Sequence, residues 1–237
     1  MTRGLLFLVF VAAPGIAQEA DTRLLVVTGG HDFEREPFFA MFDSFGGCSW
    51  RGAEHPKANH LYAPEASAEY DVLVLYDMNQ EITEEQKSEF LAMLERGKGL
   101  VILHHAFADY QDWDEFEKIR GGTYYLAPRE RGGLQLRAST FRHGVDIPVN
   151  VLAPWHPVVQ GLSDFTIHDE VYGLTICEPT INPLLGTNHP ESNATLAWTN
   201  HYGNSRIVTI QLGHDHFAFE DPNYRRLLRN AIKWVSE

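Results

Sequence analysis

The sequence predicts an α/β fold of three layers, in which helices cover both faces of a mainly parallel, flavodoxin-like sheet and an inserted β-rich lid covers one edge. Short apolar runs rich in β-branched residues support this prediction, at 23–28, 71–76 and 99–103. Each run is apolar at nearly every position, which is typical of a strand buried on both faces. Helix-like segments separate the runs, and this strand–helix–strand order indicates parallel neighbours with right-handed connections.

The helices of the amino-terminal half have recognisable ends. The first is expected near 36–45, with Pro37 in its first turn, where proline fits a helix. The second begins with a capping box, in which Thr83 is the N-cap and Gln86 the third helical residue. Gly97 ends this helix, since glycine commonly follows a helix.

The segment from about 121 to 188 has a different residue pattern from the amino-terminal half. Proline and glycine recur in it, between strand-like pieces at 124–126, 149–152 and 166–168. We interpret this segment as an insertion that covers one edge of the sheet, not as a second domain.

The carboxyl-terminal part is expected to return to the sheet. Segments 194–198 and 206–212 indicate a hairpin that turns at 202–205. Pro222 then starts a last helix, whose apolar residues are spaced for burial on one face.

The first 17 residues have the pattern of a secretory signal peptide. Arg3 gives a positive start, 5–13 is apolar, and Gly15-Ile16-Ala17 is a small-x-small cleavage signal. An uncleaved anchor is the alternative, although the apolar run is short for a membrane span. We therefore expect a soluble, exported protein, periplasmic or extracellular, with one domain over 18–237 and no membrane association after cleavage.

The charge balance restricts the partners. The 237 residues carry a formal net charge of -13 and contain no basic run, which argues against nucleic acid and anionic membrane surfaces. The two cysteines, Cys48 and Cys177, lie in no CxxC or nucleophile-type motif. We take both as structural, and the sequence leaves open whether they pair.

Histidines end three of the apolar runs, and they are the main indication of function. His31 follows the strand at 23–28, His104 follows 99–103, and His214 follows 206–212. In an open parallel sheet, ligands bind outside the carboxyl ends of the strands. We therefore expect the three imidazoles to converge there as metal ligands or acid/base groups.

Further candidates lie beside this set. Glu170 could complete a His/His/carboxylate metal site of the catalytic kind, for which Zn²⁺ is the first choice. Asp169, His105 and His156 would orient a ligand or serve as acid/base groups. Other histidines are expected in polar loops without a direct role: His55, His60, His143, His189 and His201. Four aromatic residues are expected in the core or, less commonly, as sugar-stacking platforms: Trp113, Trp155, Trp198 and Tyr172.

Motifs spread over residues 23–235 resemble the ThuA-like (trehalose-utilisation) family. They are Gly-Gly-His31-Asp32, Gly-Lys-Gly-Leu-Val-Ile-Leu-His104, His156-Pro157-Val158 with Gly161-Leu162, Asp169-Glu170-Val171-Tyr172, and Gly213-His214 before a helix that ends near Trp234. The resemblance implies a fold like that of class I glutamine amidotransferases and a link to sugar catabolism.

The same resemblance shows which chemistry is missing. Amidotransferases of this class carry a Gly-x-Cys-x-Gly elbow, whereas here His104 stands at the cysteine position and Ala106 at that of the second glycine. Without a thiolate there is no thioester route, so we do not expect a glutaminase.

These observations lead to a functional hypothesis with two alternatives. The hypothesis is an exported, metal-dependent enzyme acting on a carbohydrate or sugar derivative by hydrolysis, isomerisation or epimerisation. The alternatives are a non-catalytic sugar-binding module and a metal-free enzyme whose histidines act as acid and base. The sequence leaves the substrate and the oligomeric state open.

Overall fold

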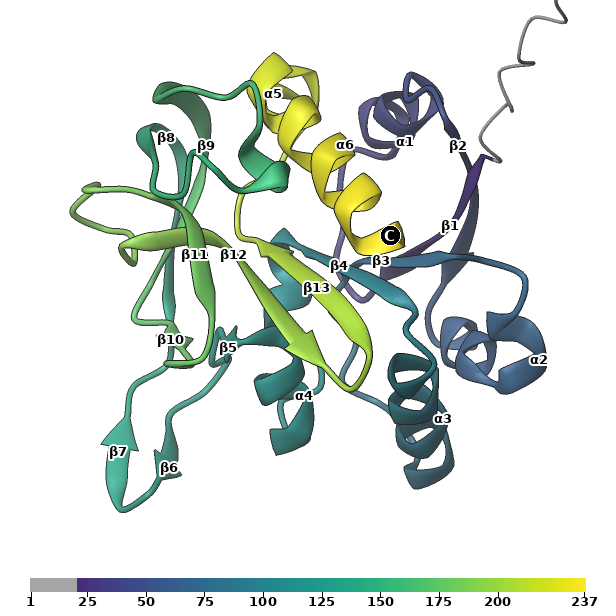
Figure 1. The fold of residues 1–237 in the computed structure, drawn as a ribbon. Coiled ribbons are helices and arrows are strands. Elements are labelled where there is room, and N and C mark those ends of the chain that lie inside the picture. The colour runs from purple at the N-terminus through teal and green to yellow at the C-terminus, as the bar shows by residue number, and fades with distance from the viewer. Residues whose placement is uncertain (1–20) are drawn as a thin grey trace, which may run out of the picture.

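A mixed β-sheet organises the chain in a computed structural model that describes residues 21–237 (Figure 1). The strand order is β2-β1-β3-β4-β13-β12-β11-β8-β9. The first five strands in this order are parallel, and their order is that of a flavodoxin-like sheet. They are β1 (Thr22–Gly29), β2 (Cys48–Glu54), β3 (Val72–Asp77), β4 (Gly99–Leu103) and β13 (Ser205–Ile210). The expected α/β class with a flavodoxin-like parallel sheet is confirmed.

The other strands of the sheet run antiparallel to their neighbours. They are β12 (Thr195–Tyr202), β11 (Asn182–Gly186), β8 (Thr140–Val151) and β9 (Phe165–Gly173). Most of the expected insertion is therefore an extension of the sheet, built from β8, β9 and β11, instead of a separate lid. The strand expected at 124–126 is wrong, because only β5 (Gly122–Thr123) forms there and pairs with β10 (Ile176–Cys177). A small ribbon, β6 (Arg129–Arg131) with β7 (Leu134–Leu136), protrudes from the body.

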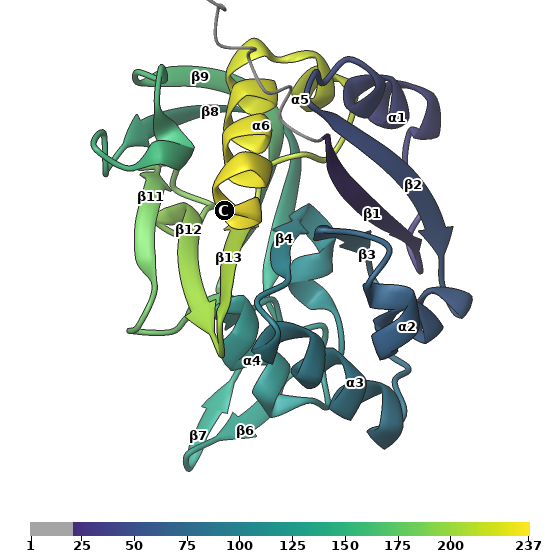
Figure 2. The ribbon, with the colours of Figure 1, turned by 45° about the vertical axis from the view of Figure 1, so that its right-hand side comes forward.

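Helices cover both faces of the parallel half, which gives the three layers (Figure 2). One face carries α1 (Arg35–Asp43), α5 (His216–Glu220) and α6 (Pro222–Ser236). The other carries α2 (Pro64–Ser67), α3 (Glu84–Glu95) and α4 (Asp114–Arg120). Three 3-10 turns complete the described elements: η1 (Lys57–Tyr62), η2 (His104–Ala108) and η3 (Pro157–Val159).

Local sequence signals account for the helix ends. The Thr83 side chain accepts a hydrogen bond from the Gln86 backbone, and Gln86 caps in return, so the capping box is confirmed. Asp221 caps α6 by accepting bonds from two backbone N–H groups, and Pro222 is the first residue of that helix. The apolar face of α6 then packs on the sheet and fixes the segment that follows β13.

The core consists of two clusters, one on each face of the sheet. The strand interiors of β3 and β4 are completely buried, as their uninterrupted apolar runs predict. On the α6 side, Leu227 and Leu228 are fully buried, and each contributes about 1.5–3 kcal/mol through its removal from water. This packing encloses the parallel strands between the two layers of helices.

Cys48 and Cys177 are both free thiols, so they do not pair with each other. Cys48 begins β2 at one edge of the large sheet, whereas Cys177 lies in β10, which pairs with β5 in a separate two-stranded sheet. None of the helices that the structure describes is long and apolar enough to cross a membrane. The expected signal peptide lies outside the described residues.

Candidate metal centre

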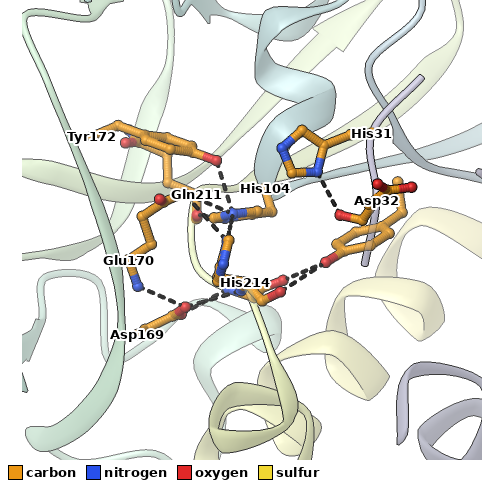
Figure 3. A network of polar contacts seen from close by, with 10 residues as sticks. His31, Asp32, His104, Asp169, Glu170, Tyr172, Gln211 and His214 are labelled. Carbon is orange, nitrogen blue, oxygen red and sulfur yellow. Dashed lines mark hydrogen bonds and ion pairs between the residues drawn. The ribbon is translucent and has the colours of Figure 1, made fainter. Parts of the chain in front are cut away.

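Three side chains meet at the carboxyl edge of the sheet (Figure 3). His104 follows β4, His214 follows β13, and Glu170 reaches them from β9. His104 Nε2 lies 3.1 Å from His214 Nδ1 and 3.2 Å from Glu170 Oε2. His214 Nδ1 lies 3.4 Å from the same carboxylate oxygen. We call these three residues the His–His–Glu group.

The spacing of the His–His–Glu group fits a metal ion. Its ligand atoms all lie within 4.8 Å of one another, so the group could hold an ion. A tetrahedral ion with bonds of about 2.0–2.2 Å separates its ligand atoms by about 3.3–3.6 Å, and octahedral geometry brings neighbouring ligands slightly closer. The observed separations agree with these values. Two imidazoles and one carboxylate are also the ligand types of catalytic zinc sites.

The turn after β4 presents His104 in a constrained conformation. Its φ is +48°, a left-handed value that side chains other than glycine rarely adopt. His104 Nδ1 lies 2.7 Å from the Gln211 carbonyl oxygen, to which it can only donate. In the neutral ring, which is the form that binds a metal, this bond fixes the tautomer and leaves the Nε2 lone pair facing the group. Such partners of a metal-binding imidazole orient it for its ion.

Asp169 positions the other two members of the group. Its carboxylate accepts hydrogen bonds from the backbone N–H groups of Glu170, Gly213 and His214, over 2.7–2.9 Å. The side chain is 1% exposed. Burial raises the pKa of Asp169, while the charge of His104 and the three N–H donors oppose that shift. The sequence suggested Asp169 as a catalytic group, whereas these contacts tie β9 to the segment after β13.

The charges within the His–His–Glu group support one another. Burial alone would raise the pKa of Glu170, but hydrogen bonds and charge interactions with His104 and His214 outweigh it and hold the pKa well below its usual range. The hydrogen bond to Glu170 is the main reason why the pKa of His214 is raised, although burial opposes it. The carboxylate is therefore ionised and available to a cation.

His31 does not join the group, although the sequence placed it among the metal ligands. Its side chain is exposed, and its Nδ1 contacts the Asp32 carbonyl oxygen at 2.6 Å. The ring stacks on His105, with centroids 4.6 Å apart. His105 is 5% exposed, and burial lowers its pKa well below the usual value. His105 is thus neutral and lies beside His104, with 5.4 Å between the two ring centroids.

His156 lies away from the group. It precedes η3, and its ring packs edge-on against Trp234 in the last turn of α6, with centroids 5.0 Å apart. That turn lies beside the start of β4, because a Cβ on Gly99 would meet Val235. His156 is thus near the amino-terminal edge of the parallel strands, whereas His104 is at the carboxyl edge. The placement gives no support to its expected catalytic role.

Two residues at the site were not singled out for it by sequence reasoning. The Tyr172 hydroxyl lies 2.8 Å from His104 Nε2. The His143 ring is 4.3 Å from the His214 ring, on a stretch of β8 where the pairing register shifts between Arg142 and Val145. Alternation along β9 was the available signal for Tyr172, since residues 170 and 172 share a face. A bulge that redirects His143 has no such signal.

His55 also differs from its expected place in a polar loop. Its side chain is 2% exposed, and its Nε2 lies 2.5 Å from a carboxylate oxygen of Asp77 at the end of β3. Asp109 lies nearby and is completely buried. Burial, and then the charge of Asp77, raise the pKa of Asp109 well above its usual value. These groups form a polar core on the α3 side of the sheet.

The large aromatic side chains are mostly structural. Trp113 and Trp198 are buried, which supports the core interpretation for both. Trp155 is 78% exposed, but it neighbours His156 at the edge away from the group. Tyr172 is buried beside His104, with the two rings nearly parallel at 27° and 4.9 Å between centroids.

The described residues form an α/β domain with a class I glutamine amidotransferase-like fold, and the His–His–Glu group includes the first residue after β4. The family model for ThuA, described as trehalose utilisation, matches residues 23–235, and the chain belongs to this family. No curated protein matches the chain significantly.

Solved structures agree with this fold. A ThuA-like protein from Parabacteroides merdae is 21% identical, with a TM-score of 0.75 over 91% of this chain and 90% of its own. A ThuA-like protein from Bacteroides uniformis is 21% identical, with a TM-score of 0.65 over 94% and 95%. A protein from Thermoplasma acidophilum, described as a candidate component of GMP synthase, is 12% identical, with a TM-score of 0.53 over 91% and 94%. At these identities the matches establish the fold alone.

Proposed function

We propose that this protein is an exported, metal-dependent enzyme that acts on a carbohydrate or a sugar derivative. The observation that carries the proposal is the His–His–Glu group, whose three ligand atoms lie 3.1–3.4 Å apart at the carboxyl edge of the sheet. Membership of a trehalose-utilisation family supports a carbohydrate as the substrate class. Export is supported by the signal-peptide pattern of residues 1–17.

Each residue of the site has a role in this proposal. His104, Glu170 and His214 would hold a divalent ion, with Zn²⁺ as the first choice. When bound, such an ion polarises a carbonyl or hydroxyl group or activates water. The carbonyl of Gln211 holds the His104 ring in place, and Asp169 accepts hydrogen bonds from the backbone N–H groups of Glu170 and His214. Hydrolysis, isomerisation and epimerisation all fit this arrangement, and we do not propose a glutaminase.

Metal binding is the test of this proposal. Chelator-treated protein would be titrated with Zn²⁺ in competition with a chromogenic chelator, and its metal content would be measured after dialysis. We expect one ion per chain, and loss of most of it in His104→Ala and His214→Ala. His156→Ala is the matched control, because it removes an imidazole at the opposite edge and should bind normally. A wild-type protein without Zn²⁺ affinity, or full occupancy in the double variant, would overturn the proposal.

A metal-free acid/base enzyme is the second candidate. It is favoured by the direct contact between the Tyr172 hydroxyl and His104 Nε2, which makes a hydrogen-bonded network without an ion. A thermal-shift screen of sugars, run with chelator and again with Zn²⁺, separates the two functions. A ligand that stabilises the protein equally in both conditions supports the second candidate.

Export has its own measurement. Mass spectrometry of the protein from its native host should find a mature chain that begins near Gln18 outside the cytoplasm. An intact Met1 in a membrane fraction would favour the anchor.

A further inference from the structure

The phenol of Tyr172 lies within the candidate metal centre (Figure 3). Tyr172 is two residues after Glu170 on β9, so both side chains project from the same face of the strand. The residue is 6% exposed, and its Oη lies 2.8 Å from His104 Nε2. Tyr124 packs edge-on against its ring, with centroids 5.0 Å apart. These contacts hold the ring beside His104.

The hydrogen bonds of His104 decide what this hydroxyl can do. In the neutral ring, which is the form that a metal ion binds, Nδ1–H is donated to the Gln211 carbonyl, so Nε2 accepts the hydrogen bond from Tyr172 Oη–H. A metal ion that binds Nε2 takes the same lone pair. The buried hydroxyl then loses its acceptor, and an unsatisfied buried hydroxyl is unfavourable. Binding of an ion therefore leaves Tyr172 Oη either with Glu170, which also interacts with this hydroxyl, or with the ion itself.

The separations around His104 Nε2 favour the ion. Three atoms that could bind a metal lie near Nε2: Tyr172 Oη at 2.8 Å, His214 Nδ1 at 3.1 Å and Glu170 Oε2 at 3.2 Å. Ligands at right angles on an ion with bonds of about 2.0–2.2 Å are about 2.8–3.1 Å apart, and tetrahedral ligands are slightly further apart. Tyr172 Oη is thus as close to Nε2 as a fourth ligand would be.

We propose that Tyr172 Oη is a fourth protein ligand, which makes the site His–His–Glu–Tyr; this inference rests on the proposed metal site. As the metal–oxygen bond forms, the phenol O–H bond breaks and its proton passes to the solvent buffer. With four protein ligands, a substrate oxygen has room only on an ion that accepts five or more ligands. Zn²⁺ reaches five-coordination, and Mn²⁺ or Fe²⁺ commonly reach six.

A Zn²⁺ titration with a spectroscopic readout tests this inference. Chelator-treated wild-type protein, Tyr172→Phe and Tyr124→Phe would be titrated with Zn²⁺ while the near-ultraviolet difference spectrum and the affinity are recorded. We expect a phenolate difference band that saturates at one Zn²⁺ per chain in the wild type and in Tyr124→Phe. Tyr172→Phe should lose the band and bind Zn²⁺ more weakly by about a hundredfold or more, since loss of an outer-shell partner alone costs 10–100-fold.

The outcomes separate this inference from the proposed function. A wild type that binds no Zn²⁺ overturns both. Zn²⁺ binding without a phenolate band, or equal affinity in Tyr172→Phe, overturns the fourth ligand alone and leaves the His–His–Glu site in place. Thermal melts of the metal-free variants show whether Tyr172→Phe is folded, and an unfolded variant leaves the wild-type band as the deciding measurement.

Discussion

Replacement of Asp169 by asparagine should destabilise the backbone that positions Glu170 and His214 in the candidate metal centre. The wild-type carboxylate accepts three backbone hydrogen bonds, from Glu170 and His214 to Oδ1 and from Gly213 to Oδ2. Asparagine offers one oxygen, so its amide group would face the buried Gly213 N–H. The Gly213 N–H would lose its acceptor, and the remaining hydrogen bonds would no longer be made to a charged group. Together these losses should lower the free energy of unfolding by about 2–4 kcal/mol. For a chain of this size that lowers Tm by roughly 4–16 °C.

Thermal unfolding followed by circular dichroism, together with Zn²⁺ titration, measures this effect. Asp146→Asn is the control, because it changes an exposed carboxylate on the neighbouring β8, which pairs with His168. Zn²⁺ affinity of Asp169→Asn should fall by about 10–100-fold, as expected for a group that orients ligands without binding the ion. An unchanged Tm, or a loss no larger than that of the control, would refute the reasoning.

Three further changes test other parts of the structure. Glu170→Gln keeps the shape of the ligand and removes its charge, so Zn²⁺ affinity in a competition titration should fall by at least about tenfold while the melting profile stays cooperative; equal affinity would exclude Glu170 as a ligand. Burial, and then the charge of Asp77, raise the pKa of Asp109, so this carboxyl group keeps its proton in the folded state. Above about pH 4 the folded state therefore binds more protons than the unfolded state. The contribution of Asp109 to the free energy of unfolding thus declines as the pH rises toward its pKa in the folded state. Asp109→Asn should flatten that decline in melts between pH 5 and 8, and an unaltered slope would contradict it. His31→Ala should leave Zn²⁺ affinity unchanged, and a clear loss would restore His31 to the ligand set.

The strands that the sequence predicted best are those buried on both faces. β3 and β4 are apolar throughout, and their runs stand out against the rest of the chain. β2 was missed because it is an edge strand in which exposed and half-buried residues alternate. Its sequence, Cys-Ser-Trp-Arg-Gly-Ala-Glu, has no apolar run, since one side faces solvent.

The insertion shows a second limit of sequence reasoning. Its pieces at 149–152 and 166–168 lie in β8 and β9, but no local pattern says which strand will pair with which. β11 joins β8 to the sheet through only two residue pairs, Leu185 with Val151 and Gly186 with Asn150. Such pairing depends on contacts that are distant in sequence, so the insertion could be recognised as β-rich but not placed.

Strand order also decided which histidines meet. His104 and His214 follow β4 and β13, which are neighbours in the sheet, whereas β3 separates β1 from β4. His31 therefore starts about 10 Å from His104 across two strand spacings. Gly29 and Gly30 both have positive φ, and the chain turns outward there, which leaves His31 exposed. The sequence identified the shared edge correctly, but the order of strands along that edge was not readable from it.

The turn after β4 shows how one backbone feature can serve different chemistry. In enzymes with a nucleophile elbow, a strained residue at this point holds a reactive side chain away from the sheet. Here the residue with φ of +48° is His104, and the bond from its Nδ1 to Gln211 directs Nε2 toward Glu170 and His214. The strain thus orients the nitrogen of a candidate ligand, and the free thiol of Cys177, in β10, is outside this group. Burial raises the pKa of Cys177 to about 11, so that thiol is not ionised near neutral pH, and a thiol reagent should leave the proposed chemistry intact.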